Sequence, residues 1–136
     1  MFGESVMLLF GHRFIPSDSF YHVSSIEGIK RTPPSSTICF EFSEANLDII
    51  EHANANYVSM ALRVANITEL IYAASLHVKY AFVTAKMAKT AQNIAENYLF
   101  DMKIIVLIED EKEIEELALL GVDGVVFANA IIKTNS

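Results

Sequence analysis

Glycine and proline are scarce in most of this chain. The 136 residues include five glycines and three prolines, and residues 35–120 contain neither. Glycine lets a backbone adopt a positive φ angle and approach a phosphate group closely. Strand-to-helix turns without glycine offer no ready phosphate cradle, so we expect no nucleotide-binding loop in this stretch.

Cysteine is scarcer still, and long apolar runs are missing. The single cysteine, Cys39, cannot form an intramolecular disulfide, and we interpret it as a small buried side chain. The compact apolar runs at 6–10 and 104–108 are far shorter than the roughly 20 residues that cross a bilayer. The N-terminus lacks a basic segment followed by a cleavage site. We therefore expect a cytoplasmic protein that has no membrane partner.

The charge of the chain is acidic and unevenly distributed. Apolar residues make up 52% of the sequence and charged residues 20%, which is typical of a domain with a well-filled core. The net charge is −7, and residues 1–35 add nothing to it because they hold three acids and three bases. The acidic excess therefore lies in residues 36–136. Such a surface repels nucleic acid, so we expect no nucleic-acid partner.

The distribution of proline and glycine divides the chain near residue 35. All three prolines and three of the five glycines precede this point. Residues 1–35 also contain two strand-like runs, and we interpret them as an N-terminal appendage, or an edge or dimerisation segment. Phe14, Phe20 and Tyr21 give this leader an apolar surface that favours covering a sheet edge or joining two subunits. The predicted partner is therefore a second copy of the chain or another protein.

Residues 36–136 show a regular alternation that indicates an α/β domain. Strands are predicted at 37–42, 57–63, 80–84, 103–108 and 124–127. Their starts are separated by 20, 23, 23 and 21 residues, the length of one strand and one crossover helix. Runs that are apolar on both faces favour a parallel sheet. The predicted fold is a three-layer α/β domain with a mostly parallel five-stranded sheet, crossover helices and the N-terminal strand-containing appendage.

The segments between these strands carry helical signals. Ile67, Leu70, Ile71 and Ala74 follow the spacing of an apolar helix face. The pairs Asn66 with Glu69 and Asp110 with Glu113 have the spacing of a capping box. The acidic run 109–116 is interpreted as the solvated face of a helix.

Polar side chains follow the predicted strands at the carboxyl edge of the sheet. Ligands of parallel α/β folds bind at this edge. A mixed-charge set there suits a small polar molecule or a divalent cation. Helix capping by itself explains some of these residue types. The candidate ligand-binding residues at this edge are Glu41, Arg63, Thr84, Lys86, Glu109 and Asn129.

Residues 121–128, which read Gly-Val-Asp-Gly-Val-Val-Phe-Ala, have the most family-like sequence. Residues 110–130 resemble the phosphate-binding end of (β/α)₈ barrels. The same junction resembles the last helix-to-strand turn of response-regulator receiver domains, and the strand spacing extends this likeness from residue 37 onward. The resemblance implies a flavodoxin-like fold. Receivers require an acceptor aspartate and a lysine, where this chain has Thr84 and then Ala128 with Asn129, so the implied domain is degenerate.

Gly11-His12-Arg13 follows an apolar run and resembles the opening of glycerophosphodiesterases, whose catalytic histidine follows a first strand. Phe14 stands where that family has glycine, and no Glu-x-Asp metal motif follows. The histidines show no metal-ligand spacing, so we predict neither a metal nor a cofactor.

Two hypotheses remain open. The leading one is a non-catalytic, receiver-like domain that acts by protein association or by binding a small polar ligand. The alternative is a small phosphoester-binding protein or enzyme related to (β/α)₈ barrels, which would use His12 and Arg13 together with Glu41, Arg63 and Lys86. Convergence of these side chains in one pocket would favour the alternative.

Overall fold

The computed structural model describes residues 6–134, so residues 1–5 of the predicted leader lie outside the described residues. The strands are β1 (Leu8–Phe10), β2 (Phe20–His22), β3 (Thr37–Glu41), β4 (Met60–Arg63), β5 (Tyr80–Val83), β6 (Lys103–Ile108), β7 (Gly124–Phe127) and β8 (Ile131–Lys133). The helices are α1 (Ile26–Ile29), α2 (Leu47–Ala55), α3 (Ile67–Ser75), α4 (Ala85–Asn97) and α5 (Glu113–Leu120), with short 3₁₀ turns η1 (Glu44–Asn46) and η2 (Ala128–Ala130). Within this part of the chain, no helix has the length and apolar content to cross a membrane.

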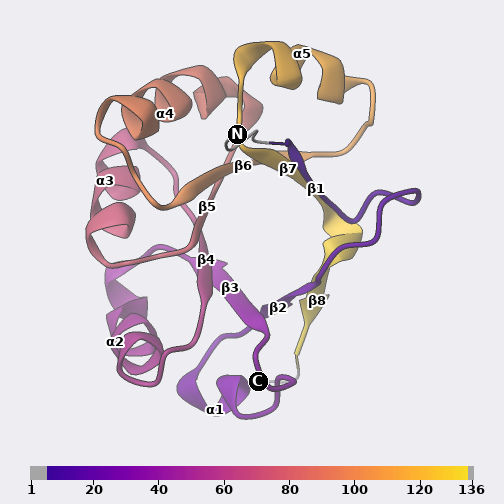
Figure 1. The fold of residues 1–136 in the computed structure, drawn as a ribbon. Coiled ribbons are helices and arrows are strands. Elements are labelled where there is room, and N and C mark those ends of the chain that lie inside the picture. Colours follow the sequence, from indigo (N-terminus) through magenta and orange to yellow (C-terminus); the bar gives the residue numbers. More distant parts are fainter. Residues whose placement is uncertain (1–5, 135–136) are drawn as a thin grey trace.

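All eight strands form one parallel sheet in the order β1-β7-β6-β5-β4-β3-β2-β8. The sheet curls into a half-barrel, and Figure 1 shows the strands arranged around a ring with the helices outside it. The predicted α/β class and parallel sheet are confirmed. The predicted strand number of five is wrong, because three further strands of only three residues each complete the sheet.

The leader supplies two of these additional strands. β1 pairs with β7, where Leu8 lies opposite Gly124, and forms one edge of the sheet. β2 lies inside the sheet, between β3 and β8. β1 thus takes an edge position, one of the expected alternatives, whereas β2 is an interior strand of the same sheet as the rest of the chain.

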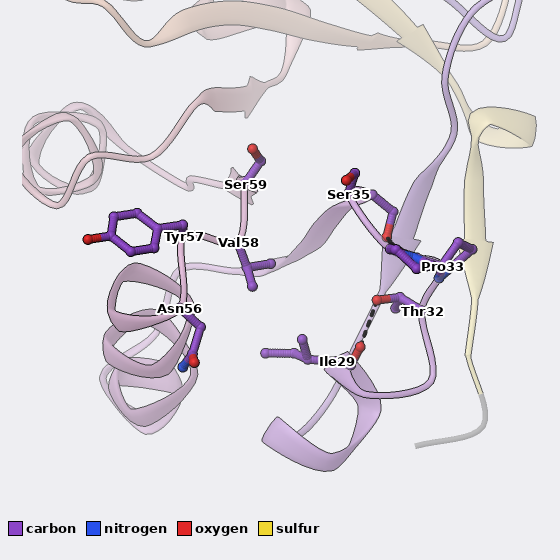
Figure 2. Close-up of a pocket in the computed structure, with 10 residues that line it drawn as sticks. Ile29, Thr32, Pro33, Ser35, Asn56, Tyr57, Val58 and Ser59 are labelled. Carbon is purple, nitrogen blue, oxygen red and sulfur yellow. Dashed lines mark hydrogen bonds between the residues drawn. The ribbon is translucent and has the colours of Figure 1, made fainter.

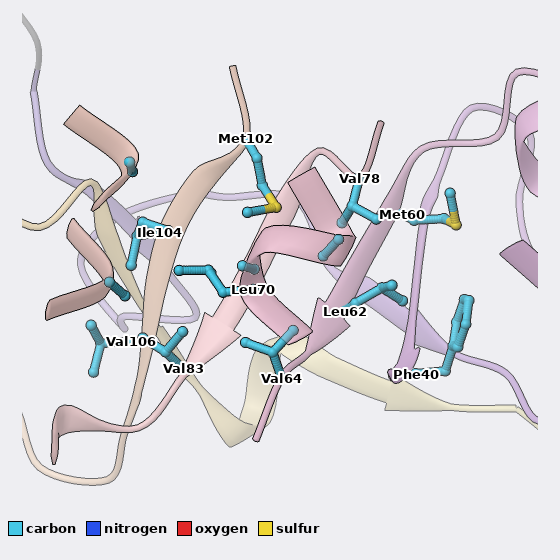
Figure 3. Packing of buried hydrophobic residues seen from close by; sticks show 14 of the residues in the cluster. Phe40, Met60, Leu62, Val64, Leu70, Val78, Val83, Met102, Ile104 and Val106 are labelled. Atoms are coloured by element: carbon cyan, nitrogen blue, oxygen red, sulfur yellow. The ribbon is translucent and has the colours of Figure 1, made fainter. Parts of the chain in front are cut away.

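The helices cover only the outer, convex face of the sheet, so the predicted three layers are reduced to two. Successive strand residues point to opposite faces, and Leu62 and Ile104 pack outward with Leu70 of α3 (Figure 3). The inner face holds a second apolar cluster to which none of the five α-helices contributes. This inner cluster comprises Phe10, Phe20, Cys39, Ala61, Phe82, Ile105, Val126 and Ala130.

Aromatic rings fill the inside of the curled sheet. The Phe20 ring is 2% exposed and lies 4.8 Å from Phe10, 5.5 Å from Tyr80 and 5.0 Å from Phe82, measured between ring centroids. Burial among these side chains raises the pKa of Cys39 to about 12, which confirms the prediction of a buried thiol. The interior is therefore a packed core, as in (β/α) barrels.

The Gly-Val-Asp-Gly segment has a structural role on the amino side of the sheet. Asp123 Oδ2 accepts from the Ile104 N–H (2.8 Å), and the Asp123 N–H donates to Oε1 of the buried Gln92 (3.1 Å). A Cβ atom on Gly124 would lie 2.6 Å from the Leu8 carbonyl oxygen. The residues with the most family-like sequence therefore connect β1, β6 and α4.

Candidate functional site at the carboxyl edge

The loops after β1, β6 and β7 meet in a pocket at the carboxyl edge. β7 pairs with β1 on one side and with β6 on the other. The three strands are parallel, so the loops that follow them emerge together although they are far apart in the sequence. The pocket has a volume of about 650 Å³ and is lined by Gly11, His12, Arg13, Glu109, Asp110, Glu111, Phe127 and Asn129.

Gly11 allows the loop after β1 to lie directly against η2. Its φ angle is +88°, and a Cβ atom at this position would lie 3.0 Å from the Ala130 Cβ. Its N–H donates to Ser17 Oγ (3.0 Å), and its carbonyl accepts from Asn129 Nδ2 (2.8 Å). These contacts fix the loop across the gap between the two edge strands, β1 and β8.

His12 is held in one orientation. Its side chain is 11% exposed, and its Nδ1 accepts from the Phe14 N–H (3.1 Å). The neutral ring therefore carries its proton on Nε2, which donates to Glu111 Oε2 at 3.0 Å. The ring also contacts the rings of Phe14 and Phe127, with centroids 5.0 and 5.8 Å away. Both ring nitrogens are therefore engaged.

Arg13 binds the same carboxylate. Its Nη1 lies 2.7 Å from Glu111 Oε2, and its Nη2 lies 3.4 Å from Oε1. Hydrogen bonds from Arg13, and to a smaller extent from His12, lower the pKa of Glu111. The Arg13 guanidinium also lies 4.4 Å from the centroid of the Phe14 ring. One carboxylate thus engages both basic side chains of the lining.

The backbone N–H groups of Glu109, Asp110 and Lys112 donate to acidic side chains of the chain itself. Glu113 Oε2 accepts from the N–H groups of Asp110 (3.2 Å) and Glu109 (3.3 Å). Asp110 Oδ1 accepts from the Lys112 N–H (2.9 Å). These carboxylates stabilise the start of α5. A ligand in the pocket would therefore be held by side chains rather than by a backbone cradle.

The structure brings together four of the eight candidate residues. His12, Arg13, Glu109 and Asn129 line the pocket. The other four, Glu41, Arg63, Thr84 and Lys86, are exposed at the same edge and do not line it. Glu41 and Arg63 lie side by side in the register of β3 and β4, whereas Thr84 and Lys86 lie at the start of α4.

Glu111 is not singled out by the sequence, where the acidic run 109–116 indicates the solvated face of a helix. It lies in the loop before α5, 98 positions from Arg13 in the sequence. No local spacing connects two residues so far apart. The available signal was the group of three acids immediately after a buried strand, because that position places them at the carboxyl edge.

A second pocket, of about 530 Å³, lies at the opposite, amino edge. Figure 2 shows Thr32, Pro33 and Ser35 on one side of it and Tyr57 and Ser59 on the other. Its lining includes no charged side chain, and the Thr32 hydroxyl already donates to the Ile29 carbonyl at 2.7 Å. This pocket lacks groups for charge recognition or proton transfer and is the weaker candidate.

Within residues 6–134, no group of three or more His, Cys, Asp or Glu side chains is arranged to hold a metal ion. Comparison of the chain with protein-family models gave no match, and comparison with curated proteins gave none either. The functional inference therefore depends on the geometry of the pocket.

Proposed function

We propose that the protein binds a small polar molecule in the carboxyl-edge pocket without catalysing a reaction. The observation that supports this most directly is the convergence of His12, Arg13, Glu109 and Asn129 from three separate loops. The pocket volume of about 650 Å³ lies within the range of roughly 300–1,000 Å³ found for small-molecule sites. Both nitrogens of His12 are engaged, so its imidazole is not available as a general base.

A thermal-shift screen with anionic, cationic and zwitterionic metabolites tests this proposal. A ligand present at 100 times its dissociation constant stabilises the folded state by about 2.7 kcal/mol. We expect a bound compound to shift the NMR amide resonances of the three pocket loops. Arg13→Gln should change the thermal shift, whereas Arg63→Gln, at the same edge but outside the lining, should not. No binding compound, or binding that maps elsewhere, would contradict the proposal.

The alternative is a phosphoester-binding protein or enzyme related to (β/α)₈ barrels. The presence of His12 and Arg13 in one pocket favours it, but Glu41, Arg63 and Lys86 do not line that pocket. Hydrolysis of a chromogenic phosphodiester is the appropriate assay. Turnover that His12→Ala abolishes, while the fold is retained, would establish the enzyme in place of the non-catalytic protein.

Self-association is the second candidate function. Phe20, one of three leader residues expected to cover a sheet edge or join subunits, is buried inside its own sheet, whereas Phe14 is 70% exposed. An apolar groove of about 490 Å³ instead lies on the outer side, between α2 and α3, and exposes Leu47 and Tyr72. We propose that a second copy of the chain packs in this groove, because the large apolar side chains of Leu47 and Tyr72 are 39% and 52% exposed beside it. Sedimentation should show a dimer that Tyr72→Ser dissociates and Phe14→Ser does not, and a monomer at every concentration would contradict this.

The resemblance to receiver domains and the cytoplasmic location stay predictions. The alternation of parallel strands and helices from β3 to β7 supports the resemblance to receiver domains. The strand order, however, runs consecutively from β2 to β7, whereas flavodoxin-like sheets reverse direction after the first strand.

A further inference from the structure

Glu111 lies where the acidic group of a ligand would bind. Its two carboxylate oxygens face the two terminal nitrogens of Arg13, at 2.7 and 3.4 Å, and Oε2 also accepts from His12 Nε2 at 3.0 Å. A planar guanidinium that faces both oxygens, with one further donor, is a favourable arrangement for carboxylate recognition. The chain thus presents one of its own carboxylates to a set of donors suited to a carboxylate.

These donors are held by contacts that do not involve Glu111. The Phe14 N–H fixes the orientation of the His12 ring, and Phe127 packs against that ring. Arg13 lies over the Phe14 ring. The hydrogen bond between Asn129 and Gly11 anchors the loop that carries both donors. The His12 ring is therefore held in place to receive another carboxylate, and Arg13, whose side chain is 64% exposed, keeps its contact with the Phe14 ring.

Glu111 itself is placed so that it can leave. Its side chain is 43% exposed, and its hydrogen bonds go to His12 and Arg13. The start of α5 is stabilised by the carboxylates of Glu113 and Asp110 instead. Rotation of the Glu111 side chain toward solvent would leave those contacts in place.

We propose that His12 and Arg13 form a binding site for the carboxylate of a small molecule, and that Glu111 closes this site as an internal competitor. The inference rests on the proposed ligand pocket and names the chemical class of its ligand. A ligand must compete with Glu111, so its apparent affinity falls with the fraction of molecules in which the site is closed. The nearby carboxylates of Glu109 and Asp110 weaken anion binding further.

Calorimetric titration of the full chain with sodium acetate, and separately with inorganic phosphate, tests the inference. Glu111→Ala should bind acetate about tenfold more tightly than the natural chain, because the competitor is gone. Glu115→Ala is the matched control, since it removes the same charge from the exposed side of the adjacent helix α5, outside the pocket lining, while the hydrogen bonds to His12 and Arg13 remain. It should change the affinity by less than about threefold, because exposed charges are screened by salt.

Each outcome decides the question. The double variant Glu111→Ala with Arg13→Gln should lose the gain in acetate affinity, and this loss would support the site. Glu111→Gln repeats the test with a side chain of nearly natural size. Equal gains in Glu111→Ala and Glu115→Ala would indicate general electrostatics and overturn the inference, as would no acetate binding by a folded Glu111→Ala. If Glu111→Ala gains affinity for phosphate and not for acetate, the assignment of a carboxylate ligand is overturned. If the NMR shifts show that only cationic or neutral compounds bind in the pocket, the inference is overturned and the proposed function still holds.

Discussion

At the scale of single residues, helices α2, α3, α4 and α5 end with left-handed backbone at the amino edge of the sheet. Tyr57, His77 and Leu99 have φ angles of 56°, 63° and 53°, and Gly121 takes the equivalent position after α5 with a φ of 80°. The N–H of the residue after each one donates back into the helix, as Phe100 does to the Ala95 carbonyl at 2.9 Å. The chain therefore adopts positive φ angles without glycine, at a conformational cost of about 1–2 kcal/mol per residue.

Leu99→Gly is predicted to stabilise the fold by about 0.5–1 kcal/mol, because glycine adopts this conformation without a Cβ penalty. The Leu99 side chain is 85% exposed, so little apolar burial is lost. Gly121→Ala is the reverse control. Its Cβ would meet no atom within 4 Å, so only the positive φ angle is penalised, and the variant should lose a similar amount of stability. Urea denaturation measures both. Changes of the same sign in the two variants would contradict the assignment of left-handed helix ends.

Glu111 is predicted to titrate below the usual pKa of a glutamate, because Arg13 and His12 stabilise its charged form. The charge that faces it from the loop after β1 is that of Arg13, with the His12 ring as a further hydrogen-bond donor, and the carboxylates of Glu109 and Asp110 lie beside it. Since the pKa is lower in the folded state than in the unfolded state, the contact stabilises the fold above the unfolded pKa. This contribution is lost as the pH falls through the folded value.

Carboxyl-carbon NMR titration checks this prediction. The pKa of Glu111 should return toward its ordinary value in Arg13→Gln. An ordinary value in the natural chain would show that the ion pair is not populated in solution.

At the scale of elements, the sequence predicted the long segments well and the short ones poorly. The strand runs at 80–84, 103–108 and 124–127 agree closely with β5, β6 and β7. β8 was missed because its three residues show too little alternation to be recognised. In α3 the predicted apolar face was partly wrong, since Ile71 is 44% exposed while Ala73 is buried.

Gly124→Ala is predicted to destabilise the fold by about 1–3 kcal/mol, a typical cost of overpacking. The new Cβ would lie 2.6 Å from the Leu8 carbonyl oxygen and 2.7 Å from the Leu8 Cβ, so β1 must shift away from β7. Chemical denaturation gives the free energy of unfolding. Hydrogen exchange should show faster exchange at the Leu8 amide, which donates to the Asp123 carbonyl. An unchanged stability would indicate that β1 does not pair with β7.

At the scale of the whole molecule, the curling of the sheet was the main feature that the sequence did not reveal. The local sequence of each strand is equally compatible with a flat sheet that helices cover on both faces. The curl depends on non-local packing, in which Phe20 from the leader meets Phe82 from the middle of the chain. The same non-local closure carries Arg13 to Glu111. Of the candidate residues that line the pocket, Glu109 and Asn129 could be predicted from their positions at the carboxyl edge. His12 and Arg13 could be predicted from the Gly-His-Arg run after an apolar strand, but the contact with Glu111 could not.

Phe20→Ala is predicted to destabilise the fold by about 3–5 kcal/mol, because it leaves a cavity among buried rings. Tyr98→Ala is the control for the loss of an aromatic ring. Tyr98 is 73% exposed, so its replacement should cost less than about 0.5 kcal/mol. Thermal and urea unfolding of both variants test the packed interior, and a small effect of Phe20→Ala would mean that the inside of the sheet is not filled as described.

The central claim is that the leader and the end of the chain together build one pocket. The most direct test is an NMR nuclear Overhauser effect between the ring protons of His12 and those of Phe127, whose ring centroids lie 5.8 Å apart. Phe127→Leu would assign the cross-peak by removing it. The structure predicts that the cross-peak is present in the natural chain at neutral pH. Its absence, together with His12 ring shifts like those of an unstructured peptide, would contradict the claim.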